Sequence, residues 1–513
     1  MRKSVLNFVF FVLQFLGFTA LFASFWVVRE FGEISFSQVL FHARIPVLDY
    51  DTPLVASFLY SVFVPSLLLG FFSNLVLAKL SKAFKASWGG LLALALVLCA
   101  FGVNLGVASA NLKVGEFLAS QKEFGSLYER HYKFFDKTAL DGVKPTQNLI
   151  VIIAESFEST LSSQSVPPLS EAKNLPPRVS LSEFYAPFGE LLPRLSTLAK
   201  THTNFSPTSV LGGVKQVFGT SYTIAGAVGA FCGVPLNAHL RFNFLDSLTD
   251  SKPYFGGAVC VSDVLGALGY KQIYYAGTNS DFGGTRELFT THGVEVRDLK
   301  VLQQLGRLPE PLPKRLSGAW GLKDGELLDL VAGELASQEL PQPFAIFVST
   351  IDTHFPRGYV DEVRCKGVRA GLEGAYLCAD KLIAEFVEFV QNSPFGANTT
   401  IIIFGDHLSM AQNFVPNEAN REVFNLFINP RFELSAQELL KLSKNRTLSH
   451  FDLAPLILNS VGLNVTALGF GRNPLRQKTL LEEAFSVPEF DAELAKTSHI
   501  YNALRQKRRQ NGL

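Results

Sequence analysis

The run NLIVIIA at residues 148–154 passes directly into Glu155 and Ser156, and this stretch decides the fold. A strand with one solvated face alternates apolar and polar residues, so an unbroken run of Leu, Ile and Val predicts a strand buried on both faces. Longer helical patterns, such as the one at residues 374–393, lie between strands of this kind. The sequence therefore predicts an α/β sandwich with a central, mostly parallel sheet. The other runs of this kind are QIYYAG (272–277), FAIFVST (344–350), TTIIIFG (399–405) and FNLFI (424–428).

The ends of these predicted strands carry groups that bind metal ions. Carboxylate or imidazole side chains follow three of the strands, namely Glu155, Asp352 with His354, and Asp406 with His407. In open α/β sheets the binding sites lie at the carboxyl ends of the strands. A divalent metal needs oxygen and nitrogen donors that converge from different elements. The sequence therefore predicts a shared divalent metal site, although any one of these Asp–His pairs taken alone could be an ordinary solvated turn.

A second segment, GTSYTIAGAVGAFCGVPL at residues 219–236, predicts a helix of small residues. We expect Thr223 to be its N-cap. A hydroxyl at a helix N-terminus lies in a positive potential, which favours both its alkoxide and a phosphate bound beside it. Thr223 is therefore a candidate nucleophile. The alternatives are an ordinary helix cap without chemistry, and Thr220 as the nucleophile.

The N-terminal part of the chain has the composition of a membrane anchor. Residues 4–28, 52–78 and 86–112 carry no charged side chain, and each stretch exceeds the roughly 20 residues that cross a bilayer core. We expect an N-terminal bundle of about three transmembrane helices; the alternative is a set of buried helices in a large soluble protein. The predicted spans are residues 5–28, 53–77 and 88–110.

Basic residues near the spans predict the orientation of the chain. Arg2 and Lys3 precede the first span, and Lys79, Lys82 and Lys85 lie between the second and the third. Basic loops remain in the cytoplasm, so an odd number of spans places the rest of the chain outside. The predicted organisation is an anchor (1–112), a juxtamembrane linker (113–146), an exported catalytic domain (147–475) and a C-terminal extension (476–513).

Four cysteines lie in the predicted exported part, at Cys232, Cys260, Cys365 and Cys378. An oxidising compartment would allow them two disulfides. The simplest pairing joins Cys232 to Cys260 and Cys365 to Cys378, and the alternative is free buried thiols. The 46 basic and 45 acidic residues nearly balance, which argues against a nucleic-acid partner.

Taken in order, five segments resemble the membrane-anchored phosphoglycerol transferases of the alkaline-phosphatase and sulfatase superfamily, which include lipoteichoic acid synthases and phosphoglycerol transferase I. The resemblance runs from about residue 147 to residue 475 and implies a sandwich of the alkaline-phosphatase type. The signature of formylglycine sulfatases is absent from the sequence. The segments are NLIVIIAESFE, GTSYTIAGAVGAFCGVPL, TIDTHFPRGY, FGDHLSM and LGFGRNPL.

The resemblance also implies roles for individual residues. Glu155, Asp406 and His407 match metal ligands of the family, and Thr223 matches a threonine that is both nucleophile and ligand. His354 matches a histidine beside the substrate, which could shuttle a proton or hold a phosphate oxygen. Arg286 lies close to a substrate contact of the family, the alternative being a salt bridge on a helix surface. Manganese is the expected metal, with magnesium and zinc as alternatives.

The implied activity is transfer of glycerophosphate from phosphatidylglycerol to a periplasmic glycan, or to another hydroxyl acceptor, through a phospho-threonine intermediate. The implied location is the bacterial inner membrane, with the catalytic domain on the periplasmic side. One alternative is a phosphoethanolamine transferase that acts on lipid A or glycans. The other, from a different class, is a membrane-anchored scaffold without catalysis.

Overall fold

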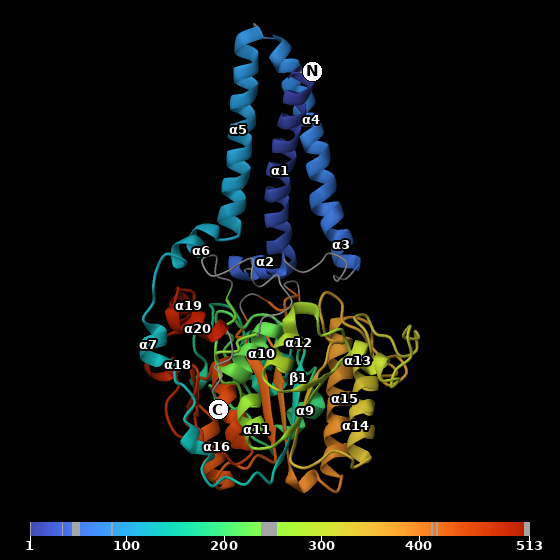
Figure 1. Cartoon of the computed structure of the whole chain (residues 1–513), viewed down its shortest axis with the longest axis vertical. Coiled ribbons are helices and arrows are strands. Elements are labelled where there is room, and N and C mark those ends of the chain that lie inside the picture. The colour runs from blue at the N-terminus through green and yellow to red at the C-terminus, as the bar shows by residue number, and fades with distance from the viewer. Residues whose placement is uncertain are drawn as a thin grey trace. The chain divides into compact units, whose positions relative to one another are not determined.

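The computed structural model describes residues 2–32, 34–43, 52–83, 86–237, 254–411, 414–416 and 419–506. The chain divides into an N-terminal unit, Met1–Lys122, and a C-terminal unit, Glu123–Leu513. Figure 1 shows the N-terminal unit from dark blue to cyan and the C-terminal unit from cyan to red.

The N-terminal unit is built from long apolar helices. Within the described residues, three helical segments are long and apolar enough to cross a membrane, judged by length and composition: Val5–Phe31, Leu54–Lys79 and Leu91–Asn111. Many of their large side chains are exposed, for example Phe8 and Phe72, as expected of helices that face lipid. The elements are α1 (Arg2–Phe31), α2 (Phe36–His42), α3 (Thr52–Phe58), the π-helix η2 (Leu59–Phe63), α4 (Val64–Ala83), α5 (Ala86–Asn111) and α6 (Val114–Ser120).

A mixed, mostly parallel sheet forms the centre of the C-terminal unit. In the described part of this unit the sheet has seven strands in the order β2-β7-β6-β1-β5-β3-β4. The pairs of β1 with β5 and with β6 are parallel, and β7 is antiparallel to both β6 and β2. The strands are β1 (Asn148–Ala154), β2 (Gly213–Val214), β3 (Lys271–Ala276), β4 (Glu295–Arg297), β5 (Phe344–Ser349), β6 (Thr399–Gly405) and β7 (Val423–Ile428), with a separate pair β8 (Ala467–Leu468) and β9 (Gly471–Arg472).

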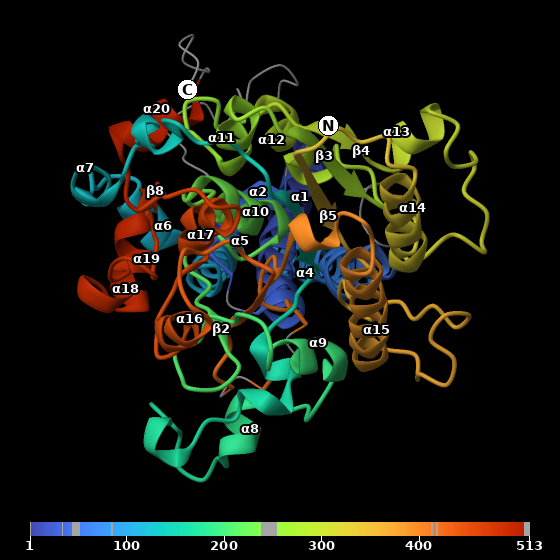
Figure 2. The same ribbon diagram turned by 90° about the horizontal axis from the view of Figure 1, so that it is seen from below.

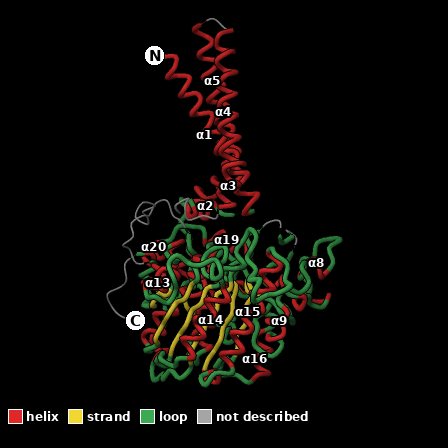
Figure 3. Tube along the Cα trace, turned by 90° about the vertical axis from the view of Figure 1, so that its right-hand side faces the viewer, coloured by secondary structure: helices red, strands yellow, loops and turns green. Residues whose placement is uncertain are grey.

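Helices cover both faces of the sheet, as Figures 2 and 3 show. On one face, α9, α14 and α15 bury alternate strand residues such as Ile150 and Ile152 in a large apolar core. On the other face, Phe231 of α10 packs against Phe347 and Phe404. This two-sided burial explains why the strands read as unbroken apolar runs. The helices are α7 (Leu127–His131), α8 (Leu181–Tyr185), α9 (Pro193–Leu198), α10 (Thr223–Cys232), α11 (Val261–Ala267), α12 (Thr285–Thr291), α13 (Leu299–Gln304), α14 (Asp324–Ala336), α15 (Leu372–Gln391), α16 (Ala436–Ser443), α17 (Leu453–Ser460), α18 (Leu480–Glu483), α19 (Val487–Leu494) and α20 (His499–Arg505).

The C-terminal helices pack into the same unit. Tyr501 of α20 is buried, and its hydroxyl accepts a hydrogen bond from the Asn237 amide at 2.8 Å. Asp491 of α19 accepts one from the Phe218 amide at 2.6 Å. The predicted extension 476–513 therefore forms part of the C-terminal unit as far as residue 506, and residues 507–513 lie outside the described ranges.

The four candidate cysteines form the local pairs Cys232–Cys260 and Cys365–Cys378. The first disulfide joins the end of α10 to the N-cap of α11. The second ties the long loop after β5 to α15. His292 lies beside the first pair, with Nε2 3.4 Å from the Cys260 Sγ. Because both sulfurs are in the disulfide, that group offers no thiolate ligand to a metal ion.

Candidate metal centre

Three buried side chains meet at the carboxyl ends of β1 and β6. One ligand atom from each of Glu155, Asp406 and His407 lies within 4.8 Å of the others. β1 and β6 are neighbouring parallel strands in which Ala154 is paired with Gly405. The next residue on each strand, Glu155 and Asp406, therefore emerges at the same edge of the sheet. The sequence predicted this position for both residues, because each directly follows a strand of the predicted parallel sheet.

The surrounding backbone fixes the orientation of the Asp406 and His407 side chains. The amides of Ser156 and His407 donate to Asp406 Oδ1 at 2.8 and 2.9 Å. His407 Nδ1 lies 2.8 Å from the Leu408 carbonyl oxygen, to which it donates. His407 Nε2 is then left 3.5 Å from both Glu155 Oε1 and Asp406 Oδ2.

Two atoms of this cluster lack a hydrogen-bond partner among the described residues. Asp406 Oδ2 and His407 Nε2 are both buried, and neither takes part in a hydrogen bond within the described part of the chain. A buried polar atom without a partner costs about 1–3 kcal/mol, and native proteins rarely leave two side by side. A cation held between them would satisfy both atoms. The donor set, two carboxylates and one imidazole, fits a divalent metal ion.

The pKa values of Asp406 and His407 are both shifted by burial and by the neighbouring carboxylates. Burial, followed by the charge of Glu155, raises the pKa of Asp406 to about 7. Burial alone would lower the pKa of His407, but the carboxylates of Asp406 and Glu155 outweigh it and raise that pKa. The cluster therefore concentrates negative charge in a buried place, which a cation would neutralise.

Thr223 reaches the cluster from a third element. Its Oγ1 donates to Glu155 Oε2 at 3.4 Å. The expectation that Thr223 is the N-cap of its helix is wrong by one residue, because Tyr222 is the N-cap and Thr223 is the first residue of α10. The extended backbone of Tyr222 (φ −157°, ψ 161°) turns the chain into the helix. The Thr223 hydroxyl therefore points to Glu155 instead of capping its own helix.

The small residues of α10 allow this approach. A Cβ added to Gly226 would lie 1.9 Å from the carbonyl oxygen of Asp406. The helix thus packs directly on the turn that carries Asp406 and His407. A larger residue at position 226 would push the N-terminus of α10, and Thr223 with it, away from the carboxylates.

Thr220, the rival nucleophile, is buried and engaged with the backbone. Its Oγ1 donates to the Val217 carbonyl at 2.8 Å and accepts from the Val217 amide at 3.1 Å. This arrangement closes the turn before α10 and favours Thr223 over Thr220 as the reactive hydroxyl.

His354 lies in the loop that follows β5, the strand next to β1. The neighbouring Thr353 donates its hydroxyl to the Glu155 carbonyl at 2.6 Å, which holds this loop against the cluster that contains Glu155. The His354 ring packs against the ring of Trp320, with 4.4 Å between their centroids. The loop of His354 and the cluster thus share one edge of the sheet.

Arg286 has two carboxylate partners, Asp281 and Asp298. Asp298 is buried, and it also accepts from the Ser280 amide at 2.8 Å. Arg286 therefore forms salt bridges, which were the alternative to a substrate contact in the sequence analysis. A role in substrate binding would require the guanidinium to keep these partners or to exchange one of them.

Two further groups around the site were missed by the sequence reasoning. Glu158, a buried residue after β1, forms a bidentate pair with Arg421 at 2.7 and 2.8 Å and accepts from the Ser409 amide. It thereby supports the turn that follows His407. Trp320 was also missed, because it belongs to a turn far away in the sequence.

Both a family model and curated proteins match this chain. A family model described as Sulfatase matches residues 147–463. The phosphoglycerol transferase I of Xanthomonas euvesicatoria is 30% identical over 339 residues, which are 64% of this chain and 43% of the relative. That of Salmonella choleraesuis is 28% identical over 353 residues, which are 67% of this chain and 41% of the relative. The chain thus spans less than half the length of these relatives.

Among solved structures, the chain is similar to the integral membrane lipooligosaccharide phosphoethanolamine transferase of Neisseria meningitidis. The TM-score is 0.49 at 13% identity, and the match covers 88% of this chain and 84% of that chain. It is also similar to a phosphoglycerol transferase of Streptococcus pyogenes in complex with sn-glycerol-1-phosphate. There the TM-score is 0.40 at 13% identity, with 74% of this chain and 91% of that chain covered.

Proposed function

The chain belongs to the sulfatase family, and we propose that it is a metal-dependent phosphoglycerol transferase. In this proposal it moves glycerophosphate from phosphatidylglycerol to a hydroxyl of a glycan. The observation that carries the proposal is the pair of unpartnered buried atoms, Asp406 Oδ2 and His407 Nε2, beside the hydroxyl of Thr223. The names of the relatives support the choice of phosphoglycerol as the transferred group.

Glu155, Thr223, Asp406 and His407 are the proposed ligands of one divalent ion, with manganese expected and magnesium or zinc as alternatives. When bound, such an ion lowers the pKa of a hydroxyl and stabilises charge on phosphoryl oxygens. Backbone hydrogen bonds orient two of these ligands: two amides donate to Asp406, and His407 donates to a carbonyl oxygen. Ligands oriented in this way need little rearrangement to bind an ion.

In the donor step, Thr223 Oγ1 attacks the phosphorus of the lipid. The oxygen–phosphorus bond to diacylglycerol breaks as the Oγ1–phosphorus bond forms. The Thr223 proton passes to Glu155, to which the hydroxyl already donates. His354 protonates the leaving diacylglycerol oxygen, and glycerophosphate remains on Thr223.

In the acceptor step, a hydroxyl of the acceptor attacks the same phosphorus. His354, now neutral, takes the proton of that hydroxyl, and the bond between phosphorus and Thr223 Oγ1 breaks. The threonine oxygen recovers its proton from Glu155, so the enzyme returns to its starting state. The N-terminus of α10 supports both steps because its positive potential stabilises the negative charge on the phosphoryl group.

The proposed location is the bacterial inner membrane, with the three apolar helices as anchor and the C-terminal unit on the extracytoplasmic side. Such an anchor would keep the active site near the lipid donor. The two disulfides support an oxidising compartment for the C-terminal unit.

The test uses the purified full chain in detergent with phosphatidylglycerol and Mn²⁺, without acceptor, followed by peptide mass spectrometry. We expect a glycerophosphate adduct on Thr223 and release of diacylglycerol, both absent in Thr223→Ala. Thr220→Ala is the matched control and should keep the adduct on Thr223. An adduct formed only with phosphatidylethanolamine would make the protein a phosphoethanolamine transferase. Failure with both lipids would favour the scaffold.

A further inference from the structure

Trp320 is the only tryptophan of the C-terminal unit, since the other two are Trp26 and Trp88. It is half-buried, and its ring lies at 61° to the ring of His354 with 4.4 Å between centroids. Large aromatic side chains normally contribute to the core. This one lies instead beside the histidine that handles protons in the proposed reaction.

The turn that carries Trp320 is anchored to the edge of the sheet where the metal cluster lies. The amide of Gly318 donates to the Gly321 carbonyl at 2.7 Å, which closes the turn. The Leu322 amide donates to the carbonyl of Gly277, just after β3, at 2.8 Å. A Cβ on Gly321 would lie 2.3 Å from that same oxygen, so the two backbones are in direct contact. The turn that carries Trp320 is therefore packed directly against the backbone that follows β3.

The loops of Trp320 and His354 are also fastened to each other. The Asp324 amide donates to Asp352 Oδ2, and the Asp352 amide donates to Asp324 Oδ2, both at 2.9 Å. Lys323 Nζ lies 3.5 Å from Asp361 Oδ2. These bonds join the residues just after Trp320 to those on either side of His354.

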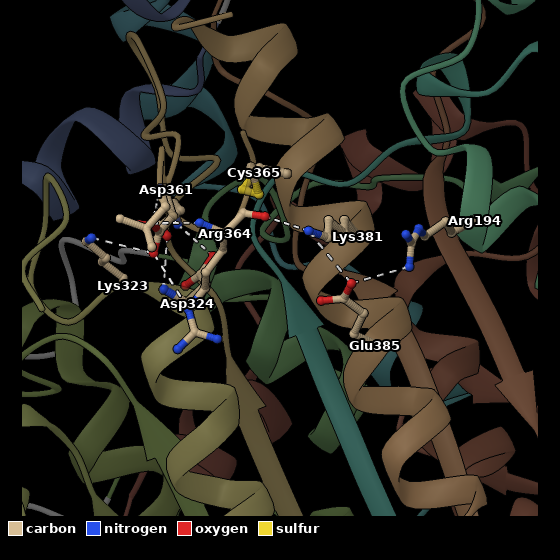
Figure 4. Close-up of a disulfide and its surroundings, with 11 residues drawn as sticks. Arg194, Lys323, Asp324, Asp361, Arg364, Cys365, Lys381 and Glu385 are labelled. Carbon is tan, nitrogen blue, oxygen red and sulfur yellow. Dashed lines mark hydrogen bonds and ion pairs between the residues drawn. A yellow bond between two sulfur atoms is a disulfide. The ribbon is translucent and has the colours of Figure 1, made fainter. Parts of the chain in front are cut away.

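Figure 4 shows how the same loop continues to α14 and α15. Arg364 pairs with Glu326 and Asp329 of α14. The disulfide of Cys365 with Cys378 holds the loop to α15. These contacts hold the loop to two helices of the core.

We propose that Trp320 is the platform on which a sugar ring of the acceptor stacks, with the attacking hydroxyl directed at His354. This inference rests on the proposed function and assigns a residue that binds its glycan acceptor. A flat indole offers an apolar surface that matches the C–H face of a pyranose ring. The face of an aromatic ring carries negative potential, so it is a poor contact for the anionic phosphate of the lipid donor. Trp320 therefore belongs to the acceptor step.

The donor step and the acceptor step can be measured separately, so the role of Trp320 can be tested in each of them. We compare the wild type, Trp320→Ala and Trp320→Phe with phosphatidylglycerol as donor and either a short linear glucan oligosaccharide or glycerol as acceptor. We expect Trp320→Ala to form the Thr223 adduct at nearly the normal rate. Its KM for the oligosaccharide should rise about tenfold, as loss of an aromatic contact predicts. Trp320→Phe should restore part of the loss, and transfer to glycerol should be unaffected.

Several outcomes overturn the inference. Slower adduct formation in Trp320→Ala, with an unchanged KM for the oligosaccharide, would mean that the indole only positions His354. Equal losses with the oligosaccharide and with glycerol would show that no sugar ring stacks on it. If the wild type forms no adduct with phosphatidylglycerol, the proposed function fails by itself. Binding of the oligosaccharide, measured by saturation-transfer NMR, then still tests Trp320, because the platform requires binding in the wild type and its loss in Trp320→Ala.

Discussion

At the scale of the residue, Gly226 sets the distance between α10 and the cluster of Glu155, Asp406 and His407. An alanine there would bring its Cβ to 1.9 Å from the Asp406 carbonyl oxygen, so the helix would have to move away. A misplacement of about 1 Å in a reacting group can cost about 100-fold in rate. We therefore expect Gly226→Ala to slow formation of the Thr223 adduct by about that factor, as measured by quantitative mass spectrometry over time.

A second helical glycine provides the matched control for this prediction. A Cβ on Gly333 of α14 would meet nothing within 4 Å, and alanine is the better helix former by about 0.8–1 kcal/mol. Gly333→Ala should raise the melting temperature slightly and leave the adduct rate unchanged. If Gly226→Ala and Gly333→Ala reacted equally fast, close packing at Gly226 would have no part in placing Thr223.

At the scale of the element, Asp380 of α15 supports the start of α9. Its carboxylate accepts from the amides of Arg194 and Leu195 at 3.0 and 2.9 Å. Burial raises the pKa of Asp380 to about 6, because it outweighs these two hydrogen bonds, which lower that pKa. The pKa of an aspartate in the unfolded chain is about 3.9. The folded state therefore holds this proton more tightly. Stability from this group is complete below about pH 4 and is lost as the pH rises to about 6.

The variant Asp380→Asn tests this dependence because it cannot ionise. We expect the unfolding free energy of the wild type, minus that of the variant, to decrease by up to about 3 kcal/mol between about pH 4 and pH 7. Chemical denaturation of both proteins in detergent at the two pH values measures it. A difference that stays constant with pH would mean that Asp380 titrates normally in the folded chain.

The elements also show what the sequence could predict. The continuous apolar runs at 148–154 and 399–405 coincide with β1 and β6, because strands buried on both faces leave an unmistakable pattern. Strands β2 and β4 were not predicted. They have two and three residues, too few for a periodicity, and they exist through pairing with β7 and β3.

The same reasoning explains what was foreseen of the candidate site. The meeting of Glu155 with Asp406 and His407 follows from neighbouring parallel strands, so local patterns were enough to predict it. Trp320 reaches His354 through tertiary contacts that have no local signature, among them the bond from the Leu322 amide to the Gly277 carbonyl. The start of α10 was predicted to within one residue, because Tyr222 and not Thr223 is its N-cap.

At the scale of the whole molecule, the charge pattern around the apolar helices predicts the orientation of the chain. Lys79, Lys82 and Lys85 should keep the loop between the second and third spans in the cytoplasm. A fluorescent protein inserted in this loop should fold and fluoresce, whereas alkaline phosphatase fused to the C-terminus should be active. The reverse pair of fusions is the control. An inactive phosphatase at the C-terminus would place the C-terminal unit in the cytoplasm and remove the access to a periplasmic glycan.

Anchoring predicts a kinetic difference between lipid and soluble donors. A tether that holds two partners together gives an effective concentration of about the millimolar range. The C-terminal unit cut free after Lys122 should therefore form the Thr223 adduct much more slowly from phosphatidylglycerol in vesicles than the full chain does. With a water-soluble glycerophosphate diester the two proteins should react at similar rates. Restoring attachment through a histidine tag and a nickel-chelating lipid should recover the rate on vesicles. If the free unit reacts with vesicles as fast as the full chain, the apolar helices do not serve to deliver the donor. If it also fails with the soluble diester, the unit depends on those helices for its active conformation.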